Sequence, residues 1–197
     1  MPKWILAGVE AGSQLREKMA VREQIEVTAY HEAGHAVMAL STGFLVTEIS
    51  CQPSDAGYGH TAWKMPAPMT KASRVGAVLT LASGMAADYI HWSSLPNKDE
   101  QEFSMGHGAD RSDARVHLDA LGQGDVFDCY LALAISHLRK VDVWHHVVTF
   151  AEMLMAVGFI NGQVILRRAS QSLPTLSVQE LEIFMRVVDL QHVQSKA

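Results

Sequence analysis

The first clear pattern of hydrophobic and polar positions is helical and covers residues 21 to about 41. Apolar residues dominate its second half, where residues 36–40 read Ala-Val-Met-Ala-Leu. Thr42-Gly43 supplies the glycine that commonly follows the end of a helix. A helix with so apolar a sequence is expected to be buried.

The next segment changes to the period of two that is typical of a strand. Val46 to Cys51 alternates apolar and polar side chains. Residues 53–59 are rich in turn formers, and His60 to Met65 reads as a second strand. The two segments together predict a β-hairpin next to the first helix.

The rest of the chain has the pattern of consecutive helices. Thr70 and Asp125 are placed to cap two of them, because their side-chain oxygens can accept from free N–H groups. Ser177 and Glu180 form a capping-box pattern in front of the last helix. The predicted fold class is therefore mainly α with one small β-hairpin. The helices predicted in this way cover residues 70–92, 109–121, 125–140, 144–156, 161–173 and 177–190.

Length and composition fit one domain with a sizeable core. The 197 residues are 48% hydrophobic and 19% charged. We expect a lead-in over residues 1–20, the domain over 21–192 and a tail over 193–197. The net charge of −5 gives no sign of nucleic-acid binding. No apolar run approaches the ~18 residues of a membrane span, and the first ten residues lack a signal-peptide pattern, so a cytoplasmic location is expected.

A chemical motif lies inside the first helix. His31-Glu32-Ala33-Gly34-His35 fits the pattern H-E-x-x-H. Residues i and i+4 share a helix face, so His31 and His35 can bind one metal ion, while Glu32 lies beside it and can take a proton from water. Such a site is typical of zinc-dependent hydrolysis. Two solvated histidines on a surface helix would not need such apolar flanks, and burying these side chains without partners would be costly. Gly34 costs roughly 1 kcal/mol relative to alanine in a helix, which indicates close approach by a neighbouring element.

Residues 28–37, Thr-Ala-Tyr-His-Glu-Ala-Gly-His-Ala-Val, resemble the peptidase domain of the FtsH family of zinc proteases, which has A-Y-H-E-A-G-H-A at this place. Weaker similarities follow in the family's order at Ile49, at residues 57–61 and at residues 81–88. Met85 stands where the family has arginine, and Asp88 stands where it has glutamate. The resemblance covers about residues 22–190. It implies zinc-dependent hydrolysis of peptide bonds with Glu32 as general base.

Two histidines leave a catalytic zinc site short of a third protein ligand. No histidine follows His35 at the spacing of the metzincins, which excludes that class. The FtsH-type pattern G-x-x-x-D-x-x-x-A matches residues 106–114, and this resemblance favours Asp110. Asp113 lies on the same helix face and remains an alternative ligand, and either carboxylate could instead stabilise a helix start. His60 in the hairpin could approach a substrate carbonyl.

The ATPase module of the family has no counterpart in this sequence, because no glycine is followed by the lysine of a phosphate-binding loop. The expected substrates are therefore flexible or unfolded polypeptides, unless a separate ATPase partner unfolds them. FtsH peptidase domains form rings, so the resemblance also implies a homo-oligomer. An alternative of another class is a non-catalytic, zinc-stabilised binding or regulatory module. Met85 and the missing ATPase module favour it, whereas Glu32 disfavours it because a structural zinc site needs no general base.

Overall fold

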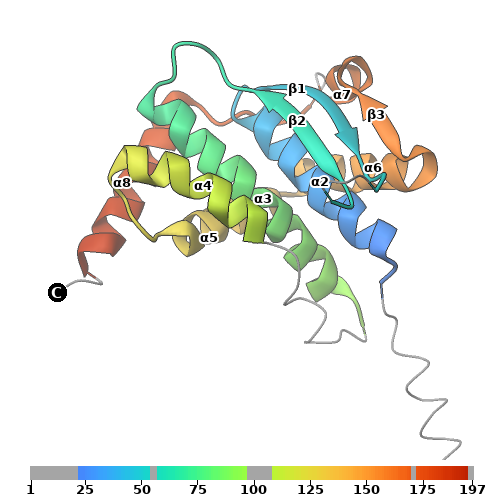
Figure 1. Cartoon of the computed structure of the whole chain (residues 1–197), viewed down its shortest axis with the longest axis horizontal. Helices are drawn as coiled ribbons and strands as arrows, with labels where there is room; N and C mark the ends of the chain where they lie inside the picture. Colours follow the sequence, from blue (N-terminus) through green and yellow to red (C-terminus); the bar gives the residue numbers. More distant parts are fainter. Residues whose placement is uncertain (1–21, 54–56, 97–107, 170–171, 195–197) are drawn as a thin grey trace, which may run out of the picture.

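Helices make up most of the chain, and a small sheet covers one side of them (Figure 1). The computed structural model describes residues 22–53, 57–96, 108–169 and 172–194. The predicted fold class, mainly α with a small β element, is confirmed. The expected lead-in over residues 1–20 and residues 195–197 of the tail lie outside the described residues. The helices are α2 Gln24–Ser41, α3 Lys71–Ser94, α4 Gly108–Leu121, α5 Phe127–Leu138, α6 Val141–Val157, α7 Gly162–Ala169 and α8 Val178–Gln194.

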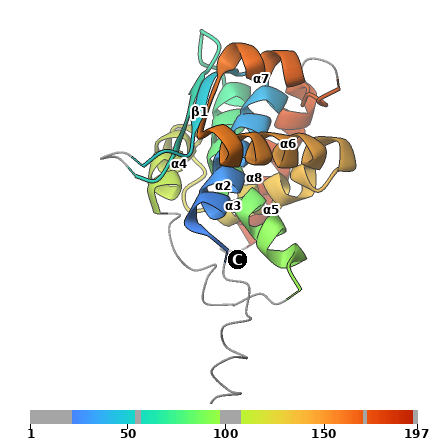
Figure 2. The same cartoon turned by 90° about the vertical axis from the view of Figure 1, so that its right-hand side faces the viewer.

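Helices α2 and α3 pack against each other at the centre of the fold, with α6 on the other side of α2 and α4 and α5 against α3 (Figures 1 and 2). The expected burial of α2 is confirmed, since most of its residues from Thr28 onward are buried. The expected close approach at Gly34 is confirmed as well. A β-carbon there would lie 2.5 Å from the main-chain oxygen of Ser83, on α3. The Ser83 hydroxyl donates a hydrogen bond to the main-chain oxygen of Gly34 over 3.0 Å.

A buried ion pair ties the residues before α2 to the far end of α3. Arg22 donates to the carboxylate of Asp88, and both side chains are almost fully buried. Close by, the rings of Tyr30 and His91 stack with their centroids 3.6 Å apart. Burying two charges is costly unless they are paired, so this contact fixes where α2 begins relative to α3.

The predicted hairpin is confirmed, and a third strand extends it. Strands β1 (Leu45–Ser50) and β2 (His60–Lys64) pair antiparallel. Strand β3 (Phe159–Asn161) pairs with the other edge of β1, which gives the order β2-β1-β3. The expectation of a single hairpin was therefore wrong. Three residues are too short to show alternation. The chain turns toward β1 at Gly158, which ends α6 in a left-handed conformation with φ 74°.

Two of the predicted helix caps are confirmed and one is wrong. Ser73 donates its main-chain N–H to the Thr70 hydroxyl over 3.1 Å, and Ser177 forms the predicted capping box with Glu180. Asp125 is not a cap, because α5 begins at Phe127 after Val126. The helix predicted over residues 161–173 is shorter than expected at both ends, because residue 161 belongs to β3 and α7 ends at Ala169. None of the helices in the described residues has the length and hydropathy needed to cross a membrane.

His137 is a buried polar side chain at the end of α5. It is 2% exposed, and neither ring nitrogen has a hydrogen-bond partner within the described residues. Burial, followed by the nearby charge of Lys140, lowers its pKa to about 4. The folded state therefore binds this proton more weakly than the unfolded state does. Stability associated with the neutral ring is complete above the unfolded pKa, near 6.5, and is lost as the pH falls toward 4.

We predict that His137→Leu is at least as stable as the wild type at pH 8, because it removes an unpaired buried polar group. Between pH 7 and pH 4 the variant should lose roughly 3 kcal/mol less unfolding free energy than the wild type. Urea unfolding across this pH range measures both quantities. His145→Leu, at an exposed position of α6, controls for the loss of one histidine. An unchanged pH dependence in His137→Leu would contradict the prediction.

Candidate metal centre

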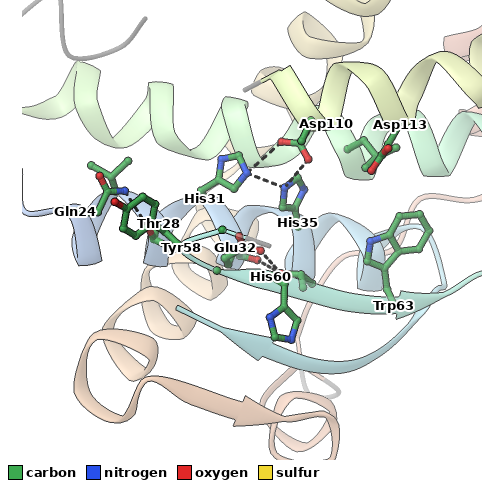
Figure 3. A pocket seen from close by; sticks show the side chains of 16 residues that line it. Gln24, Thr28, His31, Glu32, His35, Tyr58, His60, Trp63, Asp110 and Asp113 are labelled. Atoms are coloured by element: carbon green, nitrogen blue, oxygen red, sulfur yellow. Dashed lines mark hydrogen bonds and ion pairs between the residues drawn. The ribbon is translucent and has the colours of Figure 1, made fainter. Parts of the chain in front are cut away.

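Two helices bring three potential metal ligands to one point. His31 and His35 lie one turn apart on α2, with their Nε2 atoms 3.0 Å apart. Asp110, in the first turn of α4, places Oδ2 3.1 Å from His31 Nε2 and Oδ1 3.4 Å from His35 Nε2. Figure 3 shows the carboxylate above the two imidazoles. His31, His35 and Asp110 each offer one donor atom, and within the described residues these are the three side chains whose donor atoms all lie within 4.8 Å of one another.

These separations fit a small tetrahedral metal ion. Zinc binds nitrogen and oxygen ligands at about 2.0–2.1 Å, and two such ligands of a tetrahedron are then about 3.3 Å apart. The three distances of 3.0, 3.1 and 3.4 Å lie close to that value. Two imidazoles and one carboxylate are also a donor set that suits zinc better than magnesium or calcium, which prefer oxygen ligands throughout.

A main-chain carbonyl on α3 orients one of the two histidines. Nδ1 of His35 lies 2.7 Å from the main-chain oxygen of Thr80. The carbonyl can only accept, so Nδ1 carries a hydrogen, and Nε2 is the nitrogen that faces the other two potential ligands. This contact could not be predicted from the sequence, because any residue at position 80 has the same main-chain carbonyl.

Gly84 makes room for the histidine rings on the facing side of α3. A β-carbon at this position would lie 2.4 Å from His35 Nε2 and 2.7 Å from His31 Cε1. A glycine inside a long apolar helix is costly, and that cost is the sequence signal that could have identified Gly84 as a site residue.

The histidine rings and the Asp110 carboxylate stabilise each other's charged forms. Burial would lower the pKa of His35, but the Asp110 carboxylate, with help from Glu32 and the Thr80 carbonyl, outweighs burial and raises that pKa to about 9. Burial would raise the pKa of Asp110, yet the two imidazoles hold it well below its usual range. The Asp110 carboxylate is therefore ionised, and it is stabilised by positive charge at the place where a divalent cation would bind.

Glu32 lies next to the cluster without joining it. Its side chain is buried, and its Oε2 accepts a hydrogen bond of 2.8 Å from the Thr61 hydroxyl on β2. Glu32 lines the same pocket of about 510 Å³ as the three potential ligands. Residues 57–61 and Trp63 line the sheet side of this pocket (Figure 3).

The other two predicted site residues lie apart from the cluster. Asp113 lines the pocket, but Figure 3 shows it farther along α4 than Asp110, and it is not part of the group of three. His60 is half exposed, and its Nε2 lies 2.9 Å from Glu48 Oε1 on β1. Its ring lies on the opposite side of β2 from the two metal-site histidines (Figure 3). Gly106, the first residue of the predicted aspartate motif, lies outside the described residues.

No protein-family model matches this chain, and no curated protein sequence matches it significantly. The similarity to FtsH-type peptidases therefore stays a prediction from the motifs, and the assignment of the site depends on its geometry.

We predict that Gly84→Ala weakens zinc binding by at least about tenfold while leaving the helix content unchanged. The new methyl group would displace the tips of the two histidine side chains, and such changes around a metal site typically cost 10- to 100-fold in affinity. Zinc affinity by competition with a chelator dye and circular dichroism measure the two effects. Gly108→Ala is the matched control, since a β-carbon there meets nothing within 4 Å. Wild-type zinc affinity in Gly84→Ala would contradict this role.

Proposed function

We propose that this chain is a zinc-dependent metallopeptidase of the FtsH type that hydrolyses peptide bonds in flexible or unfolded polypeptides. The observation that carries the proposal is the convergence of His31, His35 and Asp110 on the wall of a pocket that Glu32 also lines. His31, His35 and Asp110 would hold the zinc ion. Three protein ligands leave a fourth position for water or substrate, which is typical of catalytic zinc sites.

Glu32 is the residue that would move the proton. A zinc ion at this site would supply Lewis acidity to a water molecule and to the scissile carbonyl. Glu32 would accept a proton from the attacking water and later deliver it to the leaving amine. Its burial beside the two histidines and its hydrogen bond to Thr61 favour a carboxylate held in one orientation.

Strand β2 would hold the substrate. Among the described residues, the sheet order β2-β1-β3 gives it one paired edge, the edge toward β1. Residues of β2 line the pocket next to the proposed zinc site. An extended peptide could add to the other edge through main-chain hydrogen bonds, which would present a peptide carbonyl to the metal and to Glu32.

The family resemblance extends the proposal to assembly and partners. We propose that the chain forms a homo-oligomer and, lacking a phosphate-binding loop, depends on a separate ATPase partner for any folded substrate. The competing interpretation, a non-catalytic zinc-stabilised module, predicts zinc binding without hydrolysis.

We predict that Asp110→Asn weakens zinc binding more than about 100-fold, because an amide is a neutral and poorer ligand than a carboxylate. Asp113→Asn should change the affinity by less than about threefold, since Asp113 lies outside the ligand group. The two substitutions are chemically identical and three residues apart, so each controls for the other. If Asp113→Asn is the damaging change, Asp113 is the third ligand.

We predict that Glu32→Gln retains zinc and lowers the hydrolysis of a quenched flexible peptide by at least about 100-fold, because glutamine keeps the shape of the side chain but not the base. Metal analysis and fluorimetry measure the two properties. Wild-type hydrolysis should stop on addition of a chelator and return with zinc. Equal turnover in wild type and variant would remove Glu32 from the mechanism, and an inactive zinc-loaded wild type would favour the binding module.

A further inference from the structure

The general base proposed for this site has a dedicated hydrogen-bond donor on the neighbouring strand. The Thr61 hydroxyl lies 2.8 Å from Glu32 Oε2 and 2.9 Å from the main-chain oxygen of Glu32. Both oxygens are acceptors, so the single hydroxyl hydrogen is directed at Glu32 in either case. A hydrogen bond to a charged acceptor is stronger than one between neutral groups, which favours the carboxylate.

The sheet fixes the position of this hydroxyl. Thr61 is opposite Ile49 in the β1–β2 register. Ile49 is fully buried, and on its other side it is opposite Ile160 of β3. A shift of β2 by one residue along β1 would turn Thr61 to the other face of the sheet, away from α2. The hydroxyl is therefore positioned by strand pairing opposite the buried side chain of Ile49.

Gly59 lets β2 come close enough to α2 for this hydrogen bond. A β-carbon at Gly59 would lie 2.6 Å from Thr28 Cγ2 and 3.1 Å from Glu32 Cγ, both on α2. It would also lie 2.8 Å from the main-chain oxygen of Ser50, on β1. The residue just before β2 thus packs directly on the glutamate side chain, and Thr61 approaches its carboxylate two residues further along the chain.

We propose that Thr61 is a positioning residue, whose hydroxyl holds the Glu32 carboxylate in the orientation for proton transfer. This inference rests on the proposed function. A glutamate side chain has several rotatable bonds, and within the described part of the chain the Thr61 hydroxyl is the side-chain donor that restrains it. The hydrogen bond reaches Oε2, which leaves Oε1 to exchange the proton with substrate groups in the pocket.

Three variants test the proposal. Thr61→Val keeps the branched shape and removes the hydroxyl, whereas Thr61→Ser keeps the hydroxyl. The matched control is Thr47→Val on β1, whose hydroxyl donates to the main-chain oxygen of Ala62 over 3.2 Å and so supports the sheet without contacting Glu32. Zinc content, kcat and KM on a quenched peptide, and crystal structures of the zinc-loaded proteins are measured.

Thr61→Val should lower kcat about 10- to 100-fold, the usual cost of losing a supporting hydrogen bond at such a site, with zinc content unchanged and KM within about twofold. Thr61→Ser and Thr47→Val should stay within about threefold of wild-type kcat. Unchanged kcat in Thr61→Val, or an equal loss in Thr47→Val, would overturn the proposal.

The crystal structures separate this inference from the proposed function. If the zinc-loaded wild type cleaves no peptide, the peptidase assignment fails, but the role of Thr61 is still decided. A Glu32 carboxylate that turns away from the two histidines in Thr61→Val and stays in place in Thr47→Val supports the positioning role. A carboxylate in the wild-type position in both variants overturns it.

Discussion

The close contact between α2 and α3 is the constraint on which the rest of the site depends. One glycine on each helix makes it possible: Gly34 lets the helix backbones touch, and Gly84 leaves space for the imidazoles of α2. The same closeness brings the Thr80 carbonyl to the ring of His35. If the helices moved apart by the width of a methyl group, this hydrogen bond would be lost and the ring would be free to rotate. The packing of α2 on α3 thus determines where the two histidine rings lie.

The candidate site combines elements that are distant in the sequence, and each is held by a different part of the core. Helix α4 brings Asp110 by packing on α3, while β2 brings Thr61 by pairing with β1. A metal ion at the centre would therefore join α2 to α4 in addition to any chemical role. Because such a site hardly exists in an unfolded chain, the binding free energy of the ion would also add to the stability of the fold.

Local sequence patterns predicted the helices and the hairpin well. They did not predict features that depend on contacts between residues distant in the sequence. The motif helix, the hairpin and the capping residues Thr70 and Ser177 each depend on a few neighbouring residues, and all of them are present in the structure. Strand β3 was missed because its three residues become a strand only by pairing with β1. The choice between two aspartates on one helix face depends on how α4 is rotated against α3, which spacing alone does not fix.

Under the proposed peptidase function, the binding of substrates along β2 would select targets by how readily they unfold. Main-chain hydrogen bonds along β2 would form with almost any extended sequence, so side chains would contribute little to the choice. A segment must first leave its own fold, and one that opens at a cost of about 4 kcal/mol is extended only about one part in a thousand of the time. Cleavage would then follow the local unfolding equilibrium of the target. Such an enzyme would act as a sensor of conformational stability, removing chains that have lost their structure and sparing well-folded neighbours in the same compartment.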